Sequence, residues 1–250
     1  MIGWTTAFVD RPADSFASVR TFWQRVTGTA MSEVRGERGE FSTFLATGAD
    51  ACLRLQRVEH GPGGTHLDLH VDDVGASAAA VERLGATRVA DLGGVVVVRS
   101  PGGLTFCLVA HHGASTRPRP VGRPGARTIV DQVCIDIAPD RFDAESDFWA
   151  AVTGWELTEG RETEYRLLER PPSMPFRLLL QRRGDRDRWR DAGCHLDLAC
   201  DDIELAARAH AELGAAVVER FSWWTVMADP AGVRYCLTAR SPDTGLPAPL

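Results

Sequence analysis

Two periods of hydrophobic residues alternate along the chain, one typical of strands and the other typical of helices. Segments with strand character lie at residues 6–8, 41–47, 52–58, 66–71, 88–92, 95–99, 105–109, 133–137, 165–168 and 176–181. Segments with helical spacing lie at residues 15–26, 74–84 and 144–152. Many strands with a few interspersed helices predict an α+β fold, in which sheets lie on one side and helices on the other.

An internal repeat organises these elements. The segment HLDL at residues 66–69 is followed by two aspartates, and it returns 129 residues later at 195–198, again followed by two aspartates. The same offset relates SPGGLTFCL at 100–108 to DPAGVRYCL at 229–237. The chain therefore contains two copies of one plan, and in each copy we expect the order β-α-β-β-β to occur twice.

The segment between the two copies has the composition of a linker. Residues 114–127 (ASTRPRPVGRPGAR) are rich in Pro, Gly and Arg and lack a periodic apolar pattern. We therefore predict one domain at residues 1–113, a linker at 114–127 and a second domain at 128–250. Two similar domains in one chain predict an internal pseudo-dimer, and association into a further homodimer is left open.

Composition and charge exclude several classes of function. The chain has 250 residues and a net charge of −6, which argues against general binding to nucleic acid or to an anionic membrane. All 28 basic residues are Arg, so Schiff-base catalysis, pyridoxal phosphate attachment and a phosphate-loop lysine are excluded. The six cysteines form no CxxC pair and predict reduced thiols. The N-terminal residues lack a signal-peptide pattern, so we expect a cytoplasmic protein.

The order of the motifs is similar to that of a known family. VTGWE at 152–156, LLLQ at 178–181, HLDL at 195–198 and DPAGVRYCL at 229–237 follow one another in the second half. This order resembles the vicinal oxygen chelate (VOC) superfamily, in its glyoxalase-like branch alongside bleomycin-resistance proteins and ring-cleaving dioxygenases. The resemblance implies tandem VOC domains, each of paired βαβββ modules that form a half-open barrel around a small-molecule cavity, with the helices outside.

The resemblance also implies where a metal would bind, because metal-dependent members take ligands from the first, often the fourth, the fifth and the eighth strands. The matching residues of the second half are Gln132, Gln181, His195 and Cys236, and those of the first half are Thr5, Gln56, His66 and Cys107. Neither set contains a carboxylate, which a divalent ion favours. We therefore do not predict a metal site formed by either set of four residues. A divalent metal is kept open as a cofactor, with His195 and His66 as the candidate ligands.

Strand alternation predicts which side chains face the cavity. Leu196 and Leu198 must pack under the helices, so His195 and Asp197 face the concave side. By the same argument, further residues face the concave side of the two sheets: His66, Asp68, His70, Arg54, Gln56, Arg177, Gln181, Thr105, Cys107, Arg234 and Cys236. Trp223 and Trp224 are adjacent on a strand and point to opposite faces, so one of them forms an aromatic wall for a ligand or packs against the other half.

These residues predict binding and transformation of a small organic acid or carbonyl compound, without the usual metal triad. His195 would act as base or ligand, Gln132 and Gln181 would polarise an oxygen, and Arg177 and Arg234 would anchor the anionic part. The remaining predicted contacts to the ligand come from Asp197, Trp223, Trp224, Cys236, His66 and Gln56. We expect the second half to carry the working site.

Other interpretations of the same residues stay open. The chain could be a non-catalytic binder that sequesters an antibiotic or metabolite, as bleomycin-resistance proteins do, or a metal-dependent lyase or dioxygenase; whether it is an enzyme at all is left open. The histidines could be hydrogen-bonded structural residues, and the cysteines buried fillers. The aspartate pairs at residues 72–73 and 201–202 most simply cap the helices that follow them.

Overall fold

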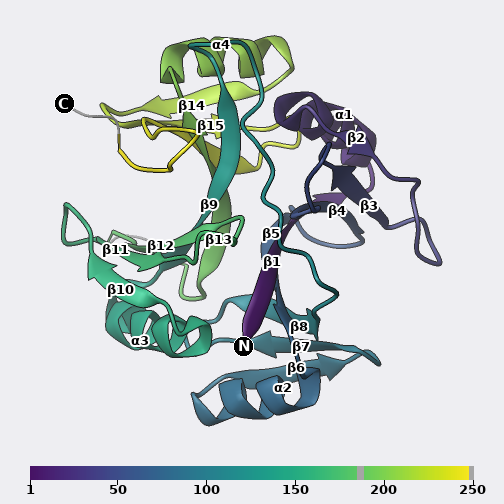
Figure 1. Ribbon diagram of the computed structural model, residues 1–250, viewed down its shortest axis with the longest axis vertical. Helices are drawn as coiled ribbons and strands as arrows, with labels where there is room; N and C mark the ends of the chain where they lie inside the picture. The colour runs from purple at the N-terminus through teal and green to yellow at the C-terminus, as the bar shows by residue number, and fades with distance from the viewer. Residues whose placement is uncertain (185–188, 248–250) are drawn as a thin grey trace. The chain divides into compact units, whose positions relative to one another are not determined.

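The computed structural model describes residues 1–184 and 189–247, and Figure 1 shows the course of the chain. The first half contains β1 (Ile2–Pro12), α1 (Phe16–Thr27), β2 (Ala30–Met31), β3 (Phe41–Leu45), β4 (Leu53–Val58), β5 (Gly64–Val71), α2 (Val74–Arg83), β6 (Thr87–Asp91), β7 (Val95–Arg99) and β8 (Thr105–Ala110).

The second half repeats this order. It contains β9 (Thr128–Ile137), the short 3₁₀ helix η1 (Pro139–Arg141), α3 (Phe142–Thr153), β10 (Glu156–Glu159), β11 (Tyr165–Glu169), β12 (Arg177–Arg182), β13 (Gly193–Cys200), α4 (Ile203–Glu212), β14 (Ala216–Arg220), β15 (Trp224–Ala228) and β16 (Arg234–Thr238). The α+β class and the paired βαβββ modules are confirmed. The short strands β2 and β10 are elements that the hydrophobic pattern did not resolve, since neither carries a clear apolar alternation.

Each half forms one open sheet of eight strands. The strand order is β2-β3-β4-β1-β5-β8-β7-β6 in the first half and β10-β11-β12-β9-β13-β16-β15-β14 in the second. Within each sheet the two modules meet where their first strands are neighbours, β1 beside β5 and β9 beside β13. No helix in the described part of the chain is long and apolar enough to cross a membrane.

The compact units of the structure combine modules from both halves. Unit 1 consists of Met1–Ala7, Thr65–Ser115 and Val133–Cys194, and unit 2 consists of Phe8–Gly64, Thr116–Gln132 and His195–Leu250. The boundaries at 1–113, 114–127 and 128–250 follow the repeat in the sequence and stay a prediction. Each unit has its own core.

The aromatic pairs on the first helices of the two halves fill these cores. In unit 2, Phe22 and Trp23 of α1 pack against Tyr235 of β16, with ring centroids 6.0 and 5.1 Å apart. In unit 1, Phe148 and Trp149 of α3 pack against Phe106 of β8 at 6.2 and 4.9 Å. Both helices therefore pack against strands of the other half.

Each buried tryptophan donates its indole N–H to a buried carboxylate, but the two carboxylates come from different elements. In unit 2, Asp229 accepts from Trp23 at 3.2 Å and from Nε of Arg11 at 2.8 Å. In unit 1, Glu145 on α3 itself accepts from Trp149 at 2.8 Å and from Ser100, which stands where Asp229 stands in the other half, at 2.5 Å. The two units thus meet the same requirement of a buried indole with different sequences.

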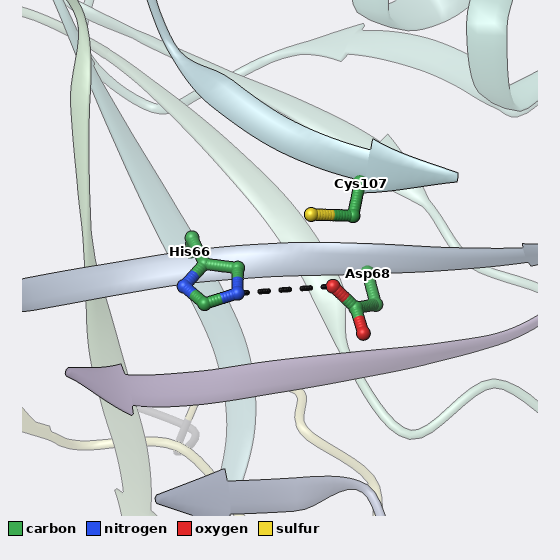
Figure 2. A group of neighbouring side chains, drawn as sticks. All are labelled: His66, Asp68 and Cys107. Atoms are coloured by element: carbon green, nitrogen blue, oxygen red, sulfur yellow. Dashed lines mark ion pairs between the residues drawn. The ribbon is translucent and has the colours of Figure 1, made fainter. Parts of the chain in front are cut away.

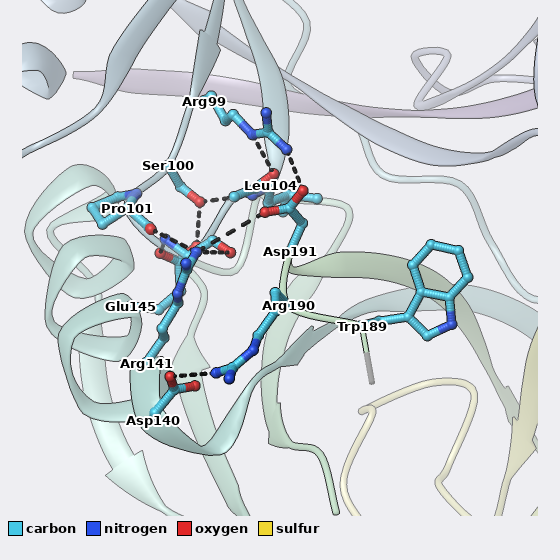
Figure 3. A network of polar contacts seen from close by, with 12 residues as sticks. Arg99, Ser100, Pro101, Leu104, Asp140, Arg141, Glu145, Trp189, Arg190 and Asp191 are labelled. Carbon is cyan, nitrogen blue, oxygen red and sulfur yellow. Dashed lines mark hydrogen bonds and ion pairs between the residues drawn. The ribbon is translucent and has the colours of Figure 1, made fainter. Parts of the chain in front are cut away.

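The Glu145 site in unit 1 is part of a larger polar network (Figure 3). Glu145 also accepts from the backbone N–H of Gly102 at 2.5 Å, which fixes the turn between β7 and β8. At the exposed side of this turn, Arg99 pairs with Asp191 at 2.6 Å, and Arg190 pairs with Asp140 at 2.8 Å. These bonds hold the turn, α3 and residues 189–192 together within unit 1.

The aspartate pairs cap helices as predicted. The side chain of Asp73 accepts the backbone N–H of Ala76 at 2.8 Å, and Asp202 accepts that of Leu205 at 2.9 Å. These are N-cap bonds of α2 and α4. The preceding residue Asp201 instead pairs with Arg127 at 2.9 Å, so only one aspartate of that pair acts as a cap.

Candidate functional site

One face of each sheet packs against the core, and the opposite face carries polar side chains; we call the latter the polar face. On β13, Leu196 and Leu198 are 2% and 1% exposed and lie on the core side. His195 and Asp197 alternate with them and therefore lie on the polar face. Leu67 and Leu69 of β5 are both fully buried, which places His66, Asp68 and His70 on the polar face in the same way. The predicted facing of both HLDL motifs agrees with this burial.

The first cluster of candidate ligands lies in unit 1 and consists of His66, Asp68 and Cys107 (Figure 2). Nε2 of His66 lies 3.8 Å from Oδ1 of Asp68. Asp68 and Cys107 are paired across the parallel strands β5 and β8, so the thiol points to the same side. One potential ligand atom from each of the three residues lies within 4.8 Å of the other two.

A hydrogen bond between β1 and β5 shows which residue of β1 lies on the polar face, and it is not the Thr5 of the sequence analysis. Oγ1 of Thr6 lies 2.8 Å from Nε2 of His70, so Thr6 is the residue on the polar face. Thr5 is the next residue along the strand and points to the opposite face, where it is 1% exposed. The motifs FW at 22–23 and 148–149 are 126 residues apart, and this offset places Thr6 opposite Gln132, but the sequence analysis did not extend it to the first strand.

The second cluster lies in unit 2 and is built on His195 and Asp197. Nε2 of His195 lies 3.4 Å from Oδ1 of Asp197 and 3.7 Å from Sγ of Cys236. Asp197 and Cys236 are paired across the parallel strands β13 and β16, as their counterparts are in unit 1. Asp197 is 3% exposed and Cys236 is 9% exposed, so both candidate ligands are buried.

A chain of hydrogen bonds holds Asp197 in place. Nε2 of Gln132 donates to Oδ2 of Asp197 at 2.5 Å. Oε1 of the same amide accepts from Arg240 at 2.7 Å, and Arg240 also pairs with the buried Asp131 at 2.7 Å. Both ends of the Gln132 amide are therefore occupied by protein partners. Gln132 orients Asp197 in this structure, rather than pointing its amide at a ligand as the sequence analysis predicted.

The atoms at the second cluster converge on one point and do not form a relay. In a nucleophilic triad, the carboxylate binds one ring nitrogen of the histidine and the nucleophile binds the other. Here the carboxylate and the thiol both face Nε2 of His195. A shared nitrogen with oxygen and sulfur neighbours is typical of a position that holds a cation or a proton.

A buried oxygen supports this interpretation. Among the residues that the structure describes, Oδ1 of Asp197 has no hydrogen-bond partner. A neutral imidazole with Nε2 unprotonated would place two lone pairs opposite each other at 3.4 Å, which is unfavourable unless a proton or a cation lies between them. One imidazole, one carboxylate and one thiolate also balance the charge of Zn²⁺ and are all zinc ligands. His195 and Asp197 therefore fit two ligands of a divalent metal, with the thiol of Cys236 beside the histidine, and Asp197 and Asp68 supply the carboxylate that the family positions lacked.

Two other predicted residues, Gln181 and Arg177, lie on the polar face of β12 in unit 1. The alternating residues Leu178 and Leu180 are fully buried. Oε1 of Gln181 accepts the thiol of Cys134 at 3.3 Å, and Arg177 is 5% exposed. Both residues belong to unit 1, whereas His195 belongs to unit 2, and their roles toward a ligand stay predictions.

The predicted residue Gln56 lies on β4 in unit 2, paired with Phe41. Both residues line a hollow of about 350 Å³ whose rim carries Arg38 and Glu59, which form an ion pair. Gln56 therefore has the accessible position expected of a ligand contact, next to an aromatic ring.

The remaining predicted contacts lie on β15 and β16 in unit 2. Trp224 is paired with Thr238, and Val226 with Cys236, so Trp224 lies on the same face as Cys236. Its ring stacks on Phe221 with centroids 4.5 Å apart. Trp223 is 38% exposed and precedes the strand. Arg234 lies on the face of Cys236 and is exposed. Trp224 is thus the member of the pair that can form an aromatic wall.

Arg240 and Thr6 are the residues that the sequence analysis missed at these clusters. Arg240 follows the last strand of its half, in a segment with no motif, and only the folded chain brings it to Gln132. Thr6 lies in a run of two threonines that alternation alone does not resolve. The HLDL spacing did place Asp197 on the same face as His195, but the sequence analysis counted Asp197 as a substrate contact and not as a candidate metal ligand.

Comparisons with known proteins agree with this architecture. A family model described as "Glyoxalase-like domain" matches residues 6–109 and 132–238. No curated protein sequence matches the chain.

Three solved structures illustrate the fold. The Mn(II)-bound glyoxalase from Novosphingobium aromaticivorans is 20% identical, with 98% of this chain and 87% of that chain covered and a TM-score of 0.61. The 2,2',3-trihydroxybiphenyl 1,2-dioxygenase from Sphingomonas wittichii strain RW1 is 19% identical, with 93% and 88% covered and a TM-score of 0.61. A variant of homoprotocatechuate 2,3-dioxygenase from B.fuscum is 14% identical, with 94% and 70% covered and a TM-score of 0.62.

At these identities the three structures show a shared fold and no more. The family model covers most of both halves, and each half has the paired βαβββ modules. The chain therefore belongs to the glyoxalase-like domain family of the VOC superfamily.

Proposed function

We propose that the chain is a metal-dependent enzyme of the glyoxalase-like type, which binds a small organic molecule through its carboxylate or carbonyl oxygens on the polar face of unit 2. The observation that carries this proposal is the buried Oδ1 of Asp197, which faces Nε2 of His195 at 3.4 Å and lacks a hydrogen-bond partner within the described part of the chain. Three solved structures of this fold are a glyoxalase and two dioxygenases, which fits an enzyme.

His195, Asp197 and Cys236 would hold the metal, and Gln132 and Arg240 would position Asp197. When bound, a divalent ion supplies Lewis-acid polarisation of a substrate oxygen. Trp224 offers a ring face to an apolar part of the substrate, and Arg234 offers a guanidinium to a carboxylate. The buried carboxylate, the thiol and the Gln132–Arg240 chain are fixed before the substrate arrives, so binding does not have to order them.

The sequence analysis proposed a site without the metal triad, and two observations change that preference. Gln132 is bound to Asp197 and Arg240, so it does not offer an amide to the substrate. A carboxylate is present beside the histidine after all. Roles in substrate binding for Gln181, Arg177, Gln56 and His66, and a cytoplasmic location, stay predictions.

A second candidate function is a binder that sequesters its ligand without turnover. Trp224 lies on the polar face of unit 2, and its ring stacks on Phe221. This aromatic surface favours a binder, because it suits a planar ligand. A binder and an enzyme differ in one respect that can be measured. A binder takes up its ligand stoichiometrically and releases it unchanged.

Metal analysis of two matched variants tests the proposal. We expect untagged protein purified without chelator to carry a divalent metal by inductively coupled plasma mass spectrometry. The chain has two clusters of candidate ligands, and we expect the ion at the second cluster to be the tightly bound one. His195→Ala should lose this ion, and His66→Ala should retain it. Loaded protein is then assayed against 2-oxo carbonyl compounds and catechols. A wild-type protein that is empty and takes up no Zn²⁺ at micromolar concentration would contradict the proposal, as would loss of the tight equivalent in His66→Ala alone.

A further inference from the structure

A separate cavity of about 170 Å³ lies in unit 2, on the core side of the second sheet. Leu198, one of its lining residues, is the neighbour of Asp197 along β13 and points to the opposite face. The cavity is therefore distinct from the His195–Asp197–Cys236 cluster. Its other walls are the end of α1, β3 and β4, the start of β9, and residues 118–121 of the linker, which cover it.

The walls of this cavity are mainly apolar. Val26, Phe44, Leu53, Ile129 and Leu198 contribute aliphatic and aromatic surface. Cys52 also lines it, and burial raises the pKa of this thiol to about 12, so it contributes no charge near neutral pH. A cavity of about 150 Å³ that is lined by Leu, Ile and Phe is large enough to hold one benzene molecule. The volume and the walls therefore suit a single six-membered ring.

The mouth of the cavity carries positive charge. Pro118, Arg119 and Pro120 line both this cavity and a neighbouring hollow of about 410 Å³, to which Arg117 and Arg127 also contribute. Arg127 is neutralised by Asp201 and Asp243, each at 2.9 Å, and Arg117 lies near the carboxylate of Asp131. Arg119 is exposed and, among the described residues, has no ion-pair partner. Its guanidinium is thus the group at the mouth that can bind an anion.

We propose that this cavity is a second binding site that takes a monocyclic aromatic carboxylate, with the ring against Phe44 and Leu198 and the carboxylate at Arg119. The ligand would join the linker to α1 and β3. Because it would bind only the folded chain, it would also raise the stability of unit 2. This site is independent of the metal cluster, so the proposed function and this inference can fail separately.

Calorimetric titration of the full chain with benzoate, benzamide and acetate tests the proposal. We expect benzoate to bind, benzamide to bind about fivefold more weakly because it lacks the charge, and acetate not to bind because it lacks the ring. Ala46→Phe, which places a ring in the cavity, should abolish benzoate binding. Ala151→Phe is the matched control, since Ala151 lies on the exposed side of α3 and does not line the cavity.

Arg119→Gln should lower benzoate affinity about fivefold to the level of benzamide, whereas Arg123→Gln, a linker arginine that lines neither hollow, should leave it unchanged. Methyl NMR provides a readout that does not depend on the folding of a variant altered at the cavity. Benzoate should shift the methyl signals of Val26, Val121 and Ile129, in wild type and in His195→Ala alike. Shifts confined to other residues, or equal affinity for benzoate and benzamide, would overturn the proposal.

Discussion

The two HLDL motifs of this chain carry the same histidine and aspartate, but the residues around them differ. In unit 2, Asp197 is held by Gln132, and Gln132 is held by Arg240. In unit 1, the corresponding strand position is Thr6, which bonds to His70 rather than extending to the aspartate as a glutamine does. The histidine and aspartate are thus the same in the two units, whereas the neighbouring strand carries a threonine in unit 1 and a glutamine in unit 2.

This difference bears directly on metal affinity. Partners that hydrogen-bond to a metal ligand fix its orientation, and losing one of them commonly lowers affinity 10- to 100-fold. The fixed carboxylate of Asp197 needs no reordering when an ion binds. We therefore predict tight binding of a divalent ion at the second cluster, with Gln132 as the residue that secures Asp197 for it.

The largest effect is expected when Arg240 is removed. Arg240→Met removes the guanidinium that bonds to the buried Asp131 at 2.7 Å, and it releases the Gln132 amide. Breaking a buried ion pair costs about 3–5 kcal/mol of unfolding free energy. Urea denaturation measures this loss. Arg127→Met is the control, because Arg127 is more exposed and its ion pairs should contribute far less to stability than a buried pair. Equal costs for the two variants would show that Arg240 has no special structural role.

The next effect is a pH dependence confined to the second half. Burial lowers the pKa of His210 on α4 to about 4, so the folded chain keeps this imidazole neutral where the unfolded chain, with a pKa near 6.5, protonates it. Stability is then fully present above pH 6.5 and falls by about 3 kcal/mol as the pH drops to about 4. Chemical denaturation at pH 7.5 and pH 4.5 measures the fall.

The first half supplies the matched variant for this test. His210 shares a hydrogen bond of 2.9 Å with Tyr235, and the residues 129 positions earlier are Val81 and Phe106, both buried. The double variant His210→Val/Tyr235→Phe copies that apolar pair, so it removes the histidine without leaving a buried hydroxyl unpaired. It should lose most of the acid sensitivity. An unchanged difference between the two pH values would assign the sensitivity to other groups.

The smallest effect concerns Thr6. Thr6→Val keeps the shape of the side chain but removes its bond to the buried His70, which should cost about 1–2 kcal/mol of unfolding free energy. Thr21→Val, at an exposed position of α1, should change stability by less than about 0.5 kcal/mol. Because Thr6 does not support a metal ligand as Gln132 does, Thr6→Val should leave the tight metal site unaffected. A loss of tight binding in Thr6→Val would place that site in unit 1.

Much of the fold could be predicted from the sequence because its signals are local. The alternation of Leu67 and Leu69 with His66 and Asp68 gives the faces of β5, and Asp73 and Asp202 mark the starts of α2 and α4. The repeat extends these assignments to the second half. Each signal depends on residues a few positions apart, so alternation and capping suffice to find it.

What could not be predicted depends on contacts between distant parts of the chain. Nothing near Phe22 indicates that it packs on Tyr235 of the other half, and nothing near Gln132 indicates that Arg240 binds its amide. The choice between Thr5 and Thr6 depends on strand register, which a single strand does not determine. The sequence therefore predicts that His195 and Asp197 belong to the candidate site. The role of Gln132 follows only from its partners in the folded chain, Asp197 and Arg240.

A titration of metal-free protein with Co²⁺ tests the central claim most directly, because a cobalt–thiolate bond gives an absorption band in the near ultraviolet. The wild-type protein should show tight uptake of one ion with this band, and Cys236→Ser should lose the band. Gln132→Thr gives unit 2 the threonine that unit 1 has at the corresponding position, Thr6. This variant should lower the affinity of the tight site for the ion 10- to 100-fold. Unchanged tight binding in Gln132→Thr, or loss of the band in Cys107→Ser instead of Cys236→Ser, would contradict the account.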